Sequence, residues 1–313
     1  MEKRVRVGIP RAMLYYKYKI MWSEFLKELG CEIVLSPKTN KSIMNEGVNN
    51  SIDESCLSSK IFVGHMKYLL EQDNLDYIFV PRIASYEKND KTCTKFYSLP
   101  DIIYNTFPES KNKLIDFNID VLNGATEKKA FLSLGLNFTK NKSKINAAYK
   151  KALASQLEHN KNMHKQQEEL MKNNNKNKIL IVSHPYNVYD DYIGQPIVDY
   201  LKKLNCEVIY SDCVYNEISR KLYSNISETL YWSYNKELVG GLEYLKDKVD
   251  GIIYLVTFPC GPDSLVVEIC QRTISNIPSL NIILDEQQGV AGQHTRLESF
   301  IDVINMRKSE LVQ

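Results

Sequence analysis

Short apolar runs, rich in β-branched residues, alternate with longer segments of helical periodicity along most of the chain. The runs predict strands at 5–9, 32–35, 77–80, 179–182, 207–210, 252–256 and 280–284. Pro81 is expected to end the third strand. Apolar side chains at helical spacing predict helices at 13–29, 60–71, 193–204 and 265–274. Continuous apolar runs suit parallel strands covered on both faces, so we predict a doubly wound α/β protein.

The two halves of the chain are loose repeats of each other. Leu-Gly-Cys-Glu-Ile-Val at 29–34 corresponds to Leu-Asn-Cys-Glu-Val-Ile at 204–209, and a proline follows each opening strand. Between the halves, Lys-Asn-Asn-Asn-Lys-Asn-Lys at 172–178 has no apolar residue for a core. We therefore predict an N-terminal lobe at 1–140, a polar helical linker at 141–177 and a C-terminal lobe at 178–313.

Charge and composition exclude several classes of protein. The 313 residues include 40 basic and 38 acidic side chains, a net charge of +2, whereas a dedicated nucleic-acid binder needs a basic surplus. No run of about 18 apolar residues predicts a membrane span, and the first residues lack the apolar segment of a signal peptide. We expect a cytoplasmic protein without a membrane or nucleic-acid partner.

Seven cysteines are too few for a disulfide scaffold, and an odd number cannot all pair. In a reducing compartment they are thiols, metal ligands or nucleophiles. Cys31 and Cys206 fall at the starts of strands, and Cys270 falls on the apolar face of a helix. Small buried hydrophobes are the usual role of such cysteines, so we predict that these three belong to the core.

Cysteines in loops that follow strands are the ones placed to bind ligands, because α/β sheets bind beyond the carboxyl ends of their strands. Cys260 lies between a strand and a helix start, where the helix dipole favours a thiolate, and Asp263 or Ser264 could cap that helix. Cys93 lies in the polar loop 85–95, which we expect to be exposed, and Cys56 precedes a helix. Their spacing forms no local metal motif, but three loop thiols suit an iron–sulfur cluster better than zinc.

Two other thiol roles stay open. Cys213 also follows a strand and is kept as a reserve ligand. A catalytic thiol would need a base, and His184 is the only histidine that directly follows a strand.

Seven short strings occur in an order that is similar to a known family. They are Gly-Ile-Pro-Arg-Ala at 8–12, Leu-Ser-Pro-Lys-Thr-Asn at 35–40, Gly-His at 64–65, Phe-Val-Pro-Arg at 79–82, His-Pro-Tyr-Asn-Val-Tyr-Asp at 184–190, Cys-Gly-Pro-Asp-Ser at 260–264 and Leu-Asp-Glu at 284–286. Between about residues 4 and 307 the chain resembles the domain associated with acyl-CoA dehydratase activases. That domain belongs with the iron–sulfur subunits of 2-hydroxyacyl-CoA dehydratases and benzoyl-CoA reductases.

The resemblance implies two Rossmann-like (flavodoxin-like) lobes with parallel sheets and a cluster site in the crevice between them. Its cysteines match Cys56, Cys93 and Cys260, which would ligate a [4Fe–4S] or double-cubane cluster for low-potential electron transfer. Leu57 stands where the family usually has proline, and Thr94 separates Cys93 from a lysine. Lost prolines change loop rigidity rather than the ligands.

The resemblance also implies a separate ATP-dependent activator of the actin/hexokinase type with its own cluster, and it allows a homodimer or a related subunit. This chain has no P-loop motif of its own. Arg11, Lys60 and Arg82 are candidate cofactor-binding residues that would neutralise cluster charge, with surface ion pairs as the alternative. Whether the chain is itself a reductase or dehydratase component stays open, as does a cluster-free binding or scaffold protein with the same fold.

Overall fold

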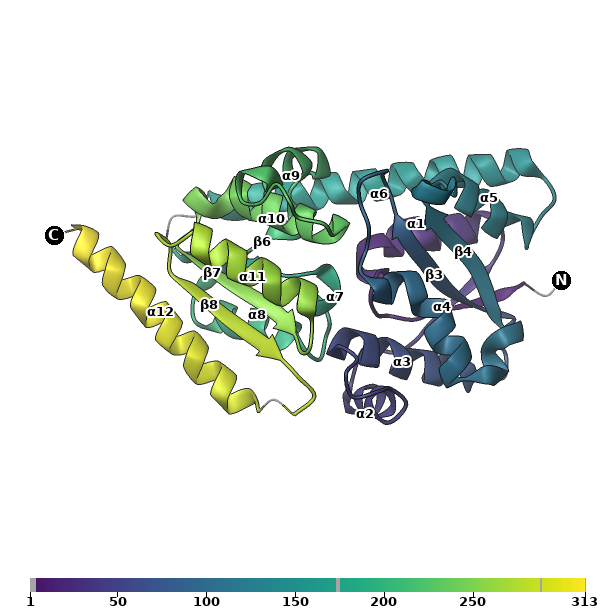
Figure 1. Ribbon diagram of the computed structural model, residues 1–313, viewed down its shortest axis with the longest axis horizontal. Helices are drawn as coiled ribbons and strands as arrows, with labels where there is room; N and C mark the ends of the chain where they lie inside the picture. Colours follow the sequence, from purple (N-terminus) through teal and green to yellow (C-terminus); the bar gives the residue numbers. More distant parts are fainter. Residues whose placement is uncertain (1–3, 173–174, 288, 313) are drawn as a thin grey trace. The chain divides into compact units, whose positions relative to one another are not determined.

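The computed structural model describes residues 4–172, 175–287 and 289–312. The chain forms two compact units, Met1–His159 and Asn160–Gln313, which we call unit 1 and unit 2 (Figure 1). Each unit contains one four-stranded sheet, and all the strand pairings within the two sheets are parallel. The prediction of a two-lobed α/β fold is confirmed.

The sheet of unit 1 has the order β2-β1-β3-β4. Its strands are β1 (Arg6–Ile9), β2 (Glu32–Leu35), β3 (Tyr77–Ser85) and β4 (Leu114–Asp120). The three predicted strands are confirmed, but the prediction that Pro81 ends the third one is wrong. β1 pairs with β3 only at Tyr77 and Ile78, so the far end of β3 has a partner on one side only. A strand tolerates proline on such an unpaired side.

Helices fill the connections of unit 1. They are α1 (Tyr15–Glu28), α2 (Lys41–Asn49), α3 (Leu57–Leu70), α4 (Thr94–Thr106) and α5 (Glu127–Leu136). Predicted helices 13–29 and 60–71 correspond to α1 and α3. Gly30 follows α1 with a φ of +89°, the left-handed conformation that ends many helices.

Two glycines let α2 and α3 cross in close contact. A Cβ added to Gly47 would lie 2.0 Å from the Lys60 carbonyl oxygen, and one added to Gly64 would lie 2.0 Å from the Ile43 carbonyl oxygen. No side chain fits at either point. This crossing fixes the helix that begins directly after Cys56.

Unit 2 repeats the same plan, with the strand order β6-β5-β7-β8. Its strands are β5 (Asn177–Val182), β6 (Cys206–Tyr210), β7 (Gly251–Thr257) and β8 (Ser279–Leu284). Its helices are α7 (Pro185–Val188), α8 (Gln195–Lys203), α9 (Asn216–Leu222), α10 (Ser233–Leu245), α11 (Gly261–Thr273) and α12 (Val290–Val312). All four strands predicted here are confirmed, and the shared order of elements confirms that the two halves are repeats.

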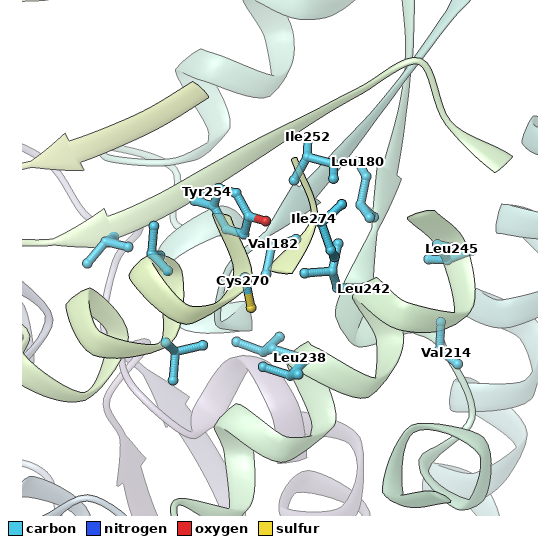
Figure 2. Packing of buried hydrophobic residues seen from close by; sticks show 14 of the residues in the cluster. Leu180, Val182, Val214, Leu238, Leu242, Leu245, Ile252, Tyr254, Cys270 and Ile274 are labelled. Atoms are coloured by element: carbon cyan, nitrogen blue, oxygen red, sulfur yellow. The ribbon is translucent and has the colours of Figure 1, made fainter. Parts of the chain in front are cut away.

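The core of unit 2 lies between its sheet and the helices α10 and α11. Figure 2 shows Cys270 among Tyr254, Val182 and Leu238, and the Cys270 side chain is fully buried. In the same unit, a Cβ on Gly240 of α10 would lie 1.9 Å from the Ser219 carbonyl oxygen of α9. The α9–α10 crossing therefore repeats the close α2–α3 crossing of unit 1.

Helix α6 (Lys142–Met171) runs through the segment that the sequence assigns to a linker, and the division between the units falls within it. Asn173 and Asn174 of the predicted linker lie outside the described residues. Short 3-10 turns are η1 (Pro108–Asn112), η2 (Val121–Asn123), η3 (Ser211–Cys213), η4 (Tyr223–Asn225) and η5 (Lys246–Lys248). Across the described ranges, no helix combines the length and the apolarity that a bilayer crossing needs.

Candidate functional site

Three cysteines occupy the same kind of position, the N-cap of a helix. Cys56 precedes α3, Cys93 precedes α4 and Cys260 precedes α11. These three are half-buried, whereas the other four cysteines of the chain are buried, and none of the seven forms a disulfide. The structure thus separates the three predicted ligands from the rest by position and exposure.

Burial keeps the core cysteines protonated. It raises the thiol pKa of Cys31 and of Cys206 to about 11 and that of Cys270 to about 12. A protonated thiol is a poor metal ligand and a poor nucleophile. The prediction that these three belong to the core is confirmed.

Cys213, the reserve ligand, is also buried. A hydrogen bond joins its sulfur to the Tyr189 hydroxyl at 3.4 Å, and burial raises its thiol pKa far above the ordinary value. The same hydroxyl donates to both carboxylate oxygens of Asp212 at 3.1 Å. This environment is that of a structural thiol, so we leave Cys213 out of the candidate site.

None of the three N-cap cysteines hydrogen-bonds its side chain to the open amides of its own helix. Each has extended backbone geometry, with φ/ψ of −62°/149° at Cys56, −59°/143° at Cys93 and −100°/103° at Cys260. The positive end of the helix dipole favours the thiolate at Cys56 and Cys93. At Cys260 the dipole is opposed by the neighbouring Asp263 carboxylate, to which the protonated thiol donates a hydrogen bond.

In unit 1 a lysine links the two cysteine-bearing turns. Lys95 Nζ, two residues after Cys93, donates to Ser55 Oγ, one residue before Cys56, at 3.3 Å. This places a positive charge between the helix starts, where it favours thiolates. Lys95 was not among the site residues predicted from the sequence, although its place two residues after Cys93 in a helix start was a usable signal.

The loop before Cys93 is more enclosed than expected. Ser85, Asp90 and Thr92 are buried, and the Thr92 hydroxyl donates to the Ile83 carbonyl oxygen. The prediction of an exposed loop is therefore wrong for these residues, because their polar groups are satisfied inside the unit. Cys93 stands at the boundary of this enclosed turn and is half-buried.

In unit 2, Asp263 organises the surroundings of Cys260. Its Oδ1 accepts hydrogen bonds from His184 Nε2 at 3.0 Å and from Asn235 Nδ2 at 2.7 Å, and its carboxylate also accepts one from the Cys260 side chain. Burial alone would raise the Asp263 pKa. The charge of His184 and the three hydrogen bonds outweigh it, so the pKa is lowered.

Two sequence interpretations are revised here. Cys260, rather than Asp263 or Ser264, is the N-cap of α11, and the Ser264 hydroxyl donates back to the Cys260 carbonyl oxygen at 2.7 Å. His184 is bound to Asp263, and the thiol of Cys260 meets the carboxylate of Asp263. In a catalytic thiol pair the imidazole takes the proton from sulfur, so this order of groups disfavours that role for His184.

The repeat shows how the two units differ in thiols. Cys93 and Cys260 are equivalent, since each caps the helix that follows the third strand of its unit. Helix α10 of unit 2 is equivalent to α3 of unit 1, and its N-cap is Trp232, whereas the N-cap of α3 is Cys56. Unit 1 therefore offers two N-cap thiols and unit 2 offers one.

The three basic residues proposed for cofactor binding have different surroundings. Arg82 forms a bidentate ion pair with Asp101, at 2.6 and 2.7 Å. This is the surface ion pair that the sequence offered as the alternative to cofactor binding. The Asp101 hydrogen bond, opposed by partial burial, raises the pKa of Arg82. Lys60 is buried in the first turns of α3, four residues after Cys56.

Arg11 follows β1, and its backbone N–H donates to Ser36 Oγ at 2.8 Å. Its Nε is buried and has no hydrogen-bond partner among the described residues. Its charge acts on His65, which is fully buried and hydrogen-bonded to Thr39 Oγ1 at 3.0 Å. Burial, together with Arg11, lowers the His65 pKa to about 3, so this histidine is neutral.

Within the ranges that the structure describes, no group of three or more histidine, cysteine or acidic side chains is gathered as a metal site. The three half-buried N-cap cysteines are therefore alike in their local position, but the described residues do not bring them together as a metal site.

Residues 6–214, more than half of the chain, match the family model described as "CoA enzyme activase uncharacterised domain (DUF2229)". The chain belongs to this family. The family-level resemblance drawn from the sequence strings is thereby confirmed.

None of the curated proteins matches the chain in sequence. Among solved structures, the crystal structure of ZnuA is 8% identical, with 97% of this chain and 99% of that chain covered and a TM-score of 0.28. Zn(II)-bound AdcA from Streptococcus pneumoniae is 7% identical, with 97% and 57% covered and a TM-score of 0.31. These scores are too low to bear on the function of this chain.

Proposed function

We propose that this member of the CoA enzyme activase uncharacterised domain family is an iron–sulfur protein that binds a [4Fe–4S] or related cluster through Cys56, Cys93 and Cys260. The observation that supports this most is the separation of the cysteines. Those three are half-buried helix N-caps, and the other four are buried. Packing alone does not explain three half-buried thiols in equivalent local positions.

The residues around these thiols fit such a group. Cluster ligands are thiolates, which helix N-termini stabilise, and the ammonium groups of Lys95 and Lys60 lie within four residues of a ligand cysteine. Three thiolates would leave one iron of a cubane open to another ligand. When bound, the cluster would supply low-potential electron transfer.

The reaction class rests on the family. A domain associated with CoA enzyme activases suits a component that receives electrons from a separate ATPase of the actin/hexokinase type carrying its own cluster. The chain would then take part in the ATP-coupled reduction of a small substrate. We propose this role as a reductase- or dehydratase-like component.

A cluster-free binding or scaffold protein is the second candidate. It is favoured by the observation that the described residues contain no assembled group of three metal-ligating side chains. The two candidates differ in one measurable property, the iron and sulfide bound per chain.

The test is anaerobic reconstitution of the full chain with iron and sulfide, followed by metal analysis and visible absorption. We expect bound iron and sulfide in the unsubstituted protein and loss of both in the triple variant Cys56→Ser, Cys93→Ser, Cys260→Ser. The control is the double variant Cys31→Ala, Cys206→Ala, which should bind as much iron as the parent protein. Equal iron in the triple variant and the parent would overturn the proposed ligands, and no iron in any of them would favour the scaffold.

A further inference from the structure

One carboxylate oxygen joins three elements of unit 2. Asp263 Oδ1, in the first turn of α11, accepts from Asn235 Nδ2 in the first turn of α10 and from His184 Nε2, two residues after the end of β5. All three side chains are buried, at 6%, 4% and 4% exposure. Hydrogen bonds to a buried charge are stronger than neutral ones, so this junction resists displacement.

The third member of the junction is itself held in place. The His184 ring stacks on Tyr186, with ring centres 4.9 Å apart and an angle of 13° between the planes. His184 is also the N-cap of α7, so its backbone is fixed by the helix start. Asp263 is therefore anchored to two independently ordered segments.

The same carboxylate lies in the first turn of α11, three residues after the N-cap Cys260, and accepts a hydrogen bond from the protonated Cys260 thiol. The repeat shows that the fold does not require this contact. Phe96 takes the equivalent position three residues after Cys93 in unit 1, and it is buried as part of the apolar core. A buried charge at this point of unit 2 costs desolvation, and core packing alone would not select it.

We propose that Asp263 is a positioning residue that directs the Cys260 sulfur, with Asn235 and His184 as its anchors. The identity of the group that the sulfur would bind rests on the proposed function. The positioning itself is tested separately, because it predicts how fast the amides of α11 exchange, and that measurement needs no bound group.

Asn235→Leu tests the anchor, because leucine is close in size to asparagine and cannot donate. Hydrogen exchange of the amides in the first turns of α11, followed by mass spectrometry of the full-length protein, measures the order of that segment. We expect exchange to be roughly tenfold faster than in the parent, as for loss of a buried hydrogen bond to a charge. The control Asn225→Leu changes an exposed asparagine and should leave α11 unchanged.

Asp263→Asn tests the contact with sulfur. The amide keeps a carbonyl oxygen that can accept from Asn235 and His184, but it removes the charge beside Cys260. We expect near-parental exchange in α11 together with a more positive midpoint potential and an altered electron paramagnetic resonance spectrum of the reconstituted cluster.

The two readouts separate the two proposals. Unchanged exchange in Asn235→Leu, or an Asp263→Asn protein with the parental potential and spectrum, would overturn the positioning role. If the parent binds no iron, the proposed function fails, whereas the exchange result in Asn235→Leu still decides whether Asp263 anchors the Cys260 turn.

Discussion

Lys95 Nζ donates to Ser55 Oγ at 3.3 Å across a sequence separation of 40 residues, and this bond joins the turns that carry Cys93 and Cys56. It holds the two N-cap thiols of unit 1 in one local framework. It also brings a cation to two positions where we propose thiolates.

Replacing this lysine should loosen a bound cluster. In Lys95→Met the Ser55 bond and the charge are lost, while an unbranched apolar side chain one atom shorter is kept. We expect a chelator to remove iron from the reconstituted protein roughly two to five times faster, the effect of one partly screened charge interaction. Lys88→Met, in the exposed part of the same loop, is the control and should release iron at the parental rate. Equal rates in both variants would remove Lys95 from the site.

The close crossing of α2 and α3 should not tolerate a methyl group. In Gly47→Ala the new Cβ would meet the Lys60 carbonyl oxygen at 2.0 Å, so the helices must move apart. We expect a loss of about 2–4 kcal/mol in the free energy of unfolding, measured with urea. Gly261→Ala adds its Cβ where nothing lies within 4 Å and should change stability by less than about 0.5 kcal/mol. Similar losses in both would show that the crossing is not tightly packed.

A buried tyrosine hydroxyl in unit 2 should be dispensable. Tyr254 is fully buried, and its hydroxyl has no hydrogen-bond partner among the described residues. Tyr254→Phe removes an unsatisfied polar atom, so we expect unchanged stability or a gain of up to about 1 kcal/mol. Tyr149→Phe removes a hydroxyl that donates to Glu127 at 2.9 Å and should cost about 1 kcal/mol. A loss of that size in Tyr254→Phe would mean that its hydroxyl has a partner.

His65 should make the protein less stable in acid. Its pKa is lowered to about 3 in the folded protein, mainly by burial, from an ordinary 6.5. Between these pH values the imidazole is protonated in the unfolded chain and neutral in the folded one. The free energy of unfolding is therefore unaffected by protonation of His65 above pH 6.5 and decreases as the pH falls toward 3. The slope is about 1.4 kcal/mol per pH unit at most. Urea unfolding from pH 7 to 4.5 should give a shallower slope for His65→Gln than for the parent, and equal slopes would contradict the assignment.

The sequence predicted the continuous strands well because buried parallel strands are apolar at every position. It missed β4, whose Leu-Ile-Asp-Phe-Asn-Ile-Asp sequence alternates between buried and exposed positions, as at the edge of a sheet. The prediction that Pro81 ends β3 was wrong, because proline ends a strand only where its missing N–H would have to pair with a neighbouring strand. That dependence is not local in the sequence.

Cys93 and Cys260 were recognisable from position, since each lies between a strand and a helix start. Cys56 lies between two helices, α2 and α3, so its position alone was a weaker signal. The partners of these cysteines were not recognisable in this way. Asp263 meets Asn235 and His184 across separations of 28 and 79 residues, and only the packing of α10 and α11 on the sheet brings these side chains together. The same holds for Lys95 and Ser55, which no local pattern connects.

We propose above all that Cys56, Cys93 and Cys260 together bind an iron–sulfur cluster. The most direct measurement is alkylation of the reconstituted protein under anaerobic conditions, before and after removal of iron with a chelator, with each cysteine quantified by peptide mass spectrometry. We expect all three to be protected before removal and labelled after it, while the buried Cys31, Cys206 and Cys270 stay unlabelled in both. Equal labelling of the three cysteines before and after removal would contradict this proposal.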